Sequence, residues 1–189
     1  MTNPTLKLPD WGKLVFVKEP PVEFAGVRCT CHRVDPTSLI ECNGYIDRVS
    51  VGIDPGRNFG ITYISDIEIL VYNGTMPSAP HDVYAEKAYD LTLEFCDTYC
   101  LTKGDVAIVE GASYGDTFGQ VGLAEIRQGF RLALKHHGLE PITVAPKSAR
   151  KVVFGSGNTQ AMNIWACLNH NAADALALGL FGSMTGGIK

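Results

Sequence analysis

The chain has 189 residues, of which 46% are hydrophobic and 19% charged, and its formal net charge is −4 at pH 7. This length fits one domain with a sizeable core. The mildly acidic balance disfavours a protein that coats nucleic acid without specificity, but it is compatible with an enzyme whose catalytic carboxylates sit beside a locally basic binding face.

The sequence contains no apolar run of about 18 residues, the length that predicts a membrane span. Its first ten residues, MTNPTLKLPD, lack the basic and then apolar pattern of a secretion signal. We therefore expect a cytoplasmic protein with no membrane partner and with reduced thiols.

Residues 1–47 are rich in proline and show no sustained period, which predicts an irregular N-terminal extension ahead of a domain at residues 48–189. Within this extension is a group of potential zinc ligands, Cys29, Cys31, His32 and Cys42. Their spacing differs from the usual Cys-x-x-Cys arrangement, so both a structural zinc site and ordinary thiols on short strands remain open.

From residue 49 onward the pattern alternates between strands and helices. Strands are predicted at 49–54, 60–65, 67–73, 105–110 and 141–145, and helices at 83–101, 121–137, 147–153, 159–169 and 171–182. This order predicts an α/β fold with a mixed five-stranded sheet flanked by helices.

Two of the predicted strands end in an acidic residue next to glycine. Asp54 ends the strand in VGIDPG, and Glu110 ends the strand in DVAIVEG. A carboxylate in such a position is costly unless something compensates it. One interpretation is that each acid caps a turn or helix independently.

The other interpretation is that Asp54, Glu110 and Asp174 converge. If the strands at 49–54 and 105–110 are neighbours, the first two carboxylates meet across the sheet. Clustered carboxylates repel one another unless a cation lies among them. Oxygen ligands of this kind select Mg²⁺ or Mn²⁺, which can activate a water against a phosphodiester.

Four motifs together resemble those of the RuvC-like Holliday junction resolvases of the ribonuclease H superfamily. They are GIDPG with Asp54, VAIVEG with Glu110, the glycine-rich turn at 154–158 and AADALALGL with Asp174. The resemblance covers about residues 49–182 and is greatest to divergent bacteriophage members. It implies a ribonuclease H-like fold and a homodimer that cuts four-way DNA junctions with a divalent metal.

The resemblance also implies four catalytic and metal-binding positions, which map to Asp54, Glu110, Asn171 and Asp174. Asn171 departs from the family, where an aspartate or sometimes a histidine is usual. Asparagine can coordinate through its carbonyl oxygen but brings no charge. It is either a natural variant of a less active enzyme or an isosteric change that silences cleavage. The adjacent His170 is either a substitute ligand or base, or a surface histidine.

Basic and aromatic residues predict the DNA contacts. Residues 127–151 contain six Lys or Arg and one acidic residue, and part of this set repeats at helical spacing. Such residues suit phosphate contacts, although solvated helix faces carry similar patterns. An aromatic residue after the strand glutamate stacks on a junction base in related resolvases. The predicted DNA-binding set is Tyr114, Phe118, Arg127, Arg131, Lys135, Lys147, Arg150 and Lys151.

Two other classes of protein compete with a junction nuclease. Actin-like ATPases share the fold but need two duplicated halves, for which 189 residues leave no room. A non-catalytic module that binds branched DNA remains open, because Asn171 lowers the charge of the predicted site.

Overall fold

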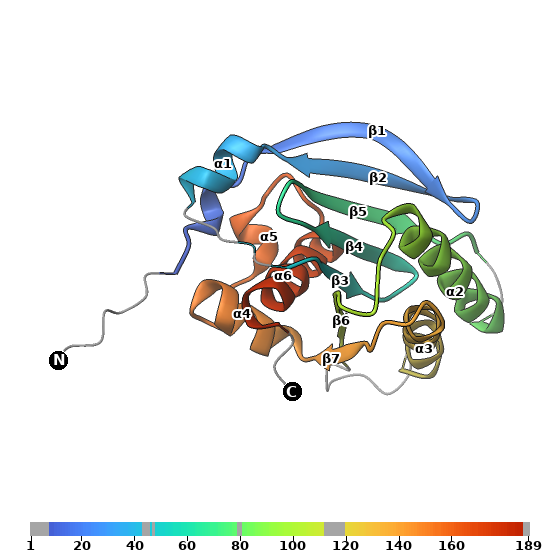
Figure 1. Cartoon of the computed structure of the whole chain (residues 1–189). Coiled ribbons are helices and arrows are strands. Elements are labelled where there is room, and N and C mark those ends of the chain that lie inside the picture. The colour runs from blue at the N-terminus through green and yellow to red at the C-terminus, as the bar shows by residue number, and fades with distance from the viewer. Residues whose placement is uncertain (1–7, 43–45, 47, 79–80, 112–119, 187–189) are drawn as a thin grey trace.

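The computed structural model describes residues 8–42, 46, 48–78, 81–111 and 120–186. Within these residues one mixed sheet has seven strands in the order β1-β2-β5-β4-β3-β6-β7 (Figure 1). The strands are β1 (Phe16–Phe24), β2 (Val27–Val34), β3 (Ser50–Asp54), β4 (Asn58–Ile64), β5 (Ile69–Thr75), β6 (Val106–Glu110) and β7 (Ile142–Val144). Strand β6 is parallel to both β3 and β7, and the other neighbours are antiparallel.

Helices cover both faces of this sheet. They are η1 (Trp11–Lys13), α1 (Pro36–Glu41), α2 (His81–Thr98), α3 (Gln120–His136), α4 (Pro146–Phe154), α5 (Ala161–Ile164) and α6 (His170–Thr185). Figure 1 shows α2 and α3 on one side of the sheet and α4, α5 and α6 on the other. The predicted α/β class with a mixed, helix-flanked sheet is confirmed. None of the described helices is both long and apolar enough to cross a membrane.

The N-terminal segment differs from its prediction, because residues 16–34 are not irregular. Strands β1 and β2 form a hairpin whose second strand pairs with β5, so the sheet has seven strands instead of five. Pro20 and Pro21 are tolerated because they lie on the edge strand, at a register shift between Glu19 and Val22 where no regular ladder is required. The division of the chain near residue 47 stays a prediction.

The predicted helix at 159–169 is also wrong in its length, because α5 covers only Ala161–Ile164. Trp165 leaves the helical conformation, with φ −118° and ψ 68°. Its ring is buried, and its indole N–H donates to the carbonyl of Trp11 over 2.8 Å. Burial of this ring against the N-terminal segment therefore ends the helix early.

Strand alternation decides which side chains face α6. Val51 and Ile53 of β3 pack in the core layer that contains α2 and α3. Their neighbours in β3 must point to the opposite face, so Asp54 faces α6. In β6, Val109 likewise packs on the α2 side and Glu110 on the α6 side. Both strand acids thus project toward the same helix.

Glycines bring α6 unusually close to β3 and β4. A Cβ atom at Gly52 would clash with the carbonyl oxygen of Ala175, and one at Gly60 would clash with the carbonyl oxygen of Asn171. Gly60 pairs directly with Asp54 across the β3–β4 hairpin. The first turns of α6 can therefore lie next to the Asp54 carboxyl group only because Gly60 carries no side chain.

We expect Gly52→Ala to destabilise the fold by about 1–3 kcal/mol or more, because the added methyl group meets helix backbone that cannot rotate away. Urea unfolding would measure the change. Gly104→Ala is the matched control, since a Cβ there meets only Thr102 Oγ1 at 3.9 Å, and we expect it to be neutral. Equal stabilities of the two variants would contradict the close approach of α6.

Candidate metal centre

Asp54 and Glu110 meet at the ends of two adjacent parallel strands. Ile53 pairs with Val109 in the β3–β6 ladder, so the two acids that follow lie side by side. Their carboxyl groups interact with each other. Burial raises the pKa of Asp54 well above its ordinary value, and the carboxyl groups of Glu110 and Asp174 raise it further. The convergence predicted from strand order is therefore present in the structure.

The start of α6 adds Asp174 and His170 to this pair. Ligand atoms of Asp54, His170 and Asp174 all lie within 4.8 Å of one another. Among the described residues, this is the group of three or more His, Cys, Asp or Glu side chains near enough to share a metal ion. His170 Nε2 lies 3.4 Å from Asp174 Oδ2, and its side chain is 57% exposed. The cluster is thus open to solvent on the histidine side.

Arg150 of α4 supplies the positive charge inside the cluster. Its Nη2 donates to Asp174 Oδ2 over 2.8 Å and to Oδ1 over 3.0 Å, and its Nε donates to Oδ1 over 3.2 Å. Both side chains are almost completely buried, at 10% and 6% exposed. Arg150 also opposes the rise in the pKa of Asp54. The guanidinium therefore partly neutralises the acidic cluster.

The side chain of Asn171 contacts the neighbouring β3–β4 hairpin. Its side-chain amide N–H donates to the backbone carbonyl of Asn58 at the start of β4. This bond ties α6 to the β3–β4 hairpin. The structure thus places Asp54 near Glu110 and near Asp174, but the group of side chains near enough to share one ion is Asp54, His170 and Asp174 and does not include Glu110. The catalytic and metal-binding roles of Asp54, Glu110, Asn171 and Asp174 stay predictions.

Two residues of the centre were not assigned these positions from sequence. His170 was weighed as a ligand but left as an alternative, and Arg150 was predicted as a DNA contact. The helical i,i+4 spacing of His170 and Asp174 was the available signal, since it places both on one face of α6. No sequence signal pairs Arg150 with Asp174, because the two lie 24 residues apart on different helices.

The basic stripe of α3 is partly bonded within the protein. Arg127 Nε donates to the carbonyl of Glu110 over 2.9 Å, and Arg131 donates to the hydroxyl of Thr143. Lys135 lies 3.7 Å from Glu140. Arg127 therefore supports the backbone of an acidic residue of the centre.

The other predicted DNA contacts divide into two groups. Lys147 and Lys151 are exposed on α4, which begins directly after β7 and its pairing of Val144 with Glu110. Tyr114 and Phe118 lie outside the described residues. The DNA-binding set therefore stays a prediction.

The potential zinc ligands of the N-terminal segment do not converge. Cys29 and Cys31 are buried in the core layer with α2, while Cys42 is buried in the layer with α6. Burial and the adjacent Cys31 raise the pKa of the Cys29 thiol to about 12, which disfavours the thiolate that zinc requires. Their arrangement therefore agrees with ordinary buried thiols.

The donor set of the acidic cluster fits a divalent cation. Burial is the largest cause of the raised pKa of Asp54, and repulsion from the carboxyl groups of Glu110 and Asp174 adds to it against the opposing charge of Arg150. A cation would relieve that repulsion.

Comparison with solved structures identifies the fold. The structure of RuvC from Thermus thermophilus matches with a TM-score of 0.57 and 19% sequence identity, covering 75% of this chain and 98% of that one. The same protein in complex with a Holliday junction substrate matches with a TM-score of 0.55 and 16% identity over the same shares of the two chains. No protein-family model and no curated protein sequence matches. The chain therefore has a RuvC-like ribonuclease H fold.

We expect Asp54→Asn to stabilise the protein without metal by about 1 kcal/mol or more, equivalent to about 2–4 °C in Tm. The pKa of Asp54 is raised in the folded state, so the protonated side chain contributes its full stabilisation below the ordinary pKa of about 3.9. This contribution is lost as the pH rises through the raised pKa. The gain from Asp54→Asn should thus be larger at pH 7.5 than at pH 4. Thermal unfolding in EDTA would measure it.

The same measurement with Mn²⁺ tests the metal site. We expect Mn²⁺ to raise the Tm of the natural chain but not that of Asp54→Asn. Asp66→Asn, an exposed acid between β4 and β5, is the control and should respond like the natural chain. Equal responses of all three proteins to Mn²⁺ would contradict a metal site at Asp54.

Proposed function

We propose that the chain is a divalent-metal-dependent endonuclease that cuts branched DNA, with four-way junctions as its preferred substrate. The observation that carries this proposal is the meeting of Asp54, Glu110 and Asp174 from two adjacent parallel strands and a helix. The RuvC-like fold supports it, because the Thermus structure with a Holliday junction substrate shares this architecture.

The chemistry would be hydrolysis of a phosphodiester by water. Asp54, Glu110 and Asp174 would hold the cation, with His170 at the open side of the site. When bound, the cation would supply Lewis acidity and lower the pKa of water at neutral pH. Arg150 lies at the same carboxylates and would offset charge that develops on the phosphate.

DNA would approach the edge of the sheet where β6 and β7 end. Lys147 and Lys151 are exposed on α4 at this edge, and Arg127 bonds to the carbonyl of Glu110 nearby. These residues would contact phosphates, which gives affinity and salt dependence without reading bases. The acidic centre would then face a DNA backbone whose phosphates are held by these basic residues.

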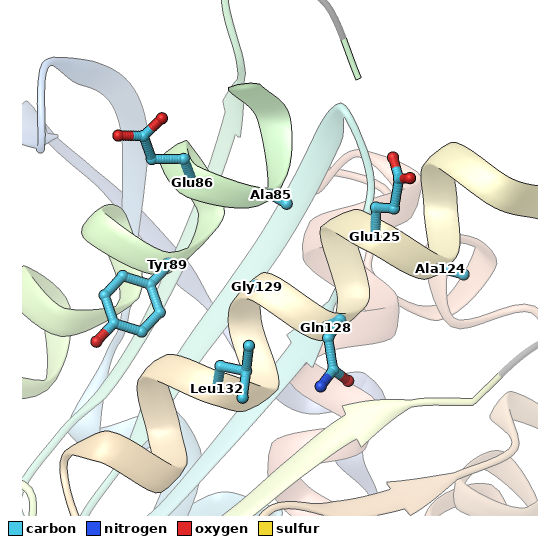
Figure 2. A pocket seen from close by; sticks show the side chains of 8 residues that line it. All are labelled: Ala85, Glu86, Tyr89, Ala124, Glu125, Gln128, Gly129 and Leu132. Carbon is cyan, nitrogen blue, oxygen red and sulfur yellow. The ribbon is translucent and has the colours of Figure 1, made fainter. Parts of the chain in front are cut away.

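We further propose that the protein acts as a homodimer. Paired cuts in a junction need two active centres, and the described residues hold one such cluster. A groove of about 800 Å³ lies between α2 and α3, on the opposite side of the sheet from α6. Figure 2 shows Glu86 and Tyr89 projecting from α2 and Glu125, Gln128 and Leu132 from α3.

The apolar part of this α2–α3 groove suits a second copy of the chain. The two helices come close together where Gly129 of α3 lies against the backbone carbonyl of Ala85 of α2. Leu132 and Leu123 of α3 are 46% and 41% exposed. A second copy would cover these leucines and leave both acidic centres open to DNA.

A non-catalytic module that binds branched DNA is the second candidate. It is favoured by the contact of Asn171 with Asn58, which leaves a neutral amide where the resemblance implies a metal-binding acid. In that case the basic residues would bind DNA and no cut would follow. The two candidates differ in Mg²⁺-dependent cleavage, not in binding.

We expect Asn171→Asp to cut a synthetic four-way junction at two opposed strands in Mg²⁺, at a higher rate than the natural chain. An aspartate cannot donate to the Asn58 carbonyl, so its carboxylate is released toward the cation. Gel assays of labelled junctions would detect the paired cuts. Tight binding without cuts in both proteins would favour the non-catalytic module.

We expect Asp54→Asn to lower any cleavage by about 10²-fold or more while junction affinity changes by less than about threefold, because the carboxylate holds metal and not DNA. Cleavage and electrophoretic mobility assays would be run on the same preparations. Asp66→Asn should retain both properties. Parallel loss of cleavage and binding in Asp54→Asn would argue against the assigned role.

We expect Leu132→Glu to convert a dimer into a monomer, because it places a charge in the apolar contact. Light scattering after size-exclusion chromatography would measure the mass. Met162→Glu is a matched control, since Met162 lies on α5 with a similar exposure of 42%, and it should stay dimeric. A natural chain that is monomeric at tens of micromolar would contradict the dimer.

A further inference from the structure

The hydrogen bonds from Arg150 to Asp174 affect how many cations the acidic centre can hold. Both carboxylate oxygens of Asp174 accept hydrogen bonds from the guanidinium, at 2.8 to 3.2 Å. Oδ2 also has His170 Nε2 at 3.4 Å. A cation that used Asp174 as a bridging ligand would therefore compete with Arg150 for the same oxygens.

The charges of the centre point to one cation. With all groups ionised, the three carboxylates of Asp54, Glu110 and Asp174 together with Arg150 leave a formal charge of minus two. One divalent ion neutralises this charge. A second ion would leave the buried centre strongly positive, and uncompensated buried charge is costly.

Asn171 does not provide the charged ligand that a second ion would need. Its amide is held by the Asn58 carbonyl and brings no charge. In a two-metal site the ions lie about 3.5–4 Å apart and share a bridging carboxylate, each with ligands of its own. Here the place beside Asp174 is taken by a guanidinium that is nine-tenths buried.

We infer that the guanidinium of Arg150 takes the place of a second divalent cation, so that the centre binds one divalent cation per chain. This inference rests on the proposed metal site. Arg150 would supply the fixed positive charge on the Asp174 side, and the cation would be held by the other ligands of the centre, among them Asp54 and His170. This charge belongs to the chain itself and does not depend on metal supply.

The test counts Mn²⁺ bound to the full natural chain by electron paramagnetic resonance of the free ion. We expect one Mn²⁺ per chain, and Asp54→Asn should abolish that binding. Two bound ions per chain would overturn the inference. No bound ion would overturn both the inference and the metal site on which it rests.

Variants of Arg150 test the cause of the count. We expect Arg150→Gln either to bind a second Mn²⁺ or to bind the first at least about tenfold more tightly, because a competing positive charge is gone. Lys151→Gln is the matched control, since it removes the same charge from an exposed position on the same helix, and its Mn²⁺ affinity should change by less than about twofold. Identical behaviour of the two variants would overturn the inference.

Loss of Arg150 leaves Asp174 buried without its partner, so folding must be checked by circular dichroism. Arg150→Lys keeps the charge, and we expect it to retain one Mn²⁺ per chain even if Arg150→Gln does not fold. A count of two in Arg150→Lys would contradict the role of the charge.

The outcomes also separate this inference from the proposed function. One bound Mn²⁺ without junction cleavage by Asn171→Asp would contradict only the proposed nuclease function. Two bound ions with cleavage would contradict only this inference.

Discussion

The close contact of α6 with β3 and β4 is the constraint on which the rest of the structure depends. Gly52 and Gly60 let the helix backbone lie against the strands, because a Cβ at either position would meet the backbone of Ala175 or Asn171. Gly60 pairs with Asp54, so the start of α6 lies close to this strand acid, and Asp174 of the same helix lies near its carboxyl group. A fold with ordinary side chains at these positions would hold α6 too far away for the carboxyl groups to meet.

The cost of that contact is electrostatic. Burial raises the pKa of Asp54, the carboxyl groups of Glu110 and Asp174 raise it further, and Arg150 relieves only part of the repulsion. Such a cluster lowers the stability of the metal-free protein, which is typical of sites kept for binding or catalysis. The residual charge is what a cation would neutralise, so the same feature that weakens the fold gives the centre its affinity for metal.

The sheet separates two surfaces with different chemistry. The α6 side carries the acidic centre, and exposed lysines of α4 lie close to it. The α2–α3 side carries an apolar groove and exposed leucines. Because the two surfaces are on opposite sides, a partner bound at the groove would leave the centre accessible. The hairpin β1–β2 widens the sheet at the β5 edge, away from β6 and β7 where the proposed DNA path begins.

The amino-acid sequence by itself determined the strand acids and their shared direction, because alternation along VGID and VAIVE puts Asp54 and Glu110 on the same face once their strands are neighbours. It also located Asp174 in the helix that follows. It did not reveal the N-terminal hairpin, since prolines on an edge strand hide the strand pattern. Only the tertiary structure decided that Arg150 bonds Asp174 and that Asn171 bonds Asn58, because these contacts join elements far apart in the chain, and their side-chain geometry exists only after α4 and β4 have packed against α6.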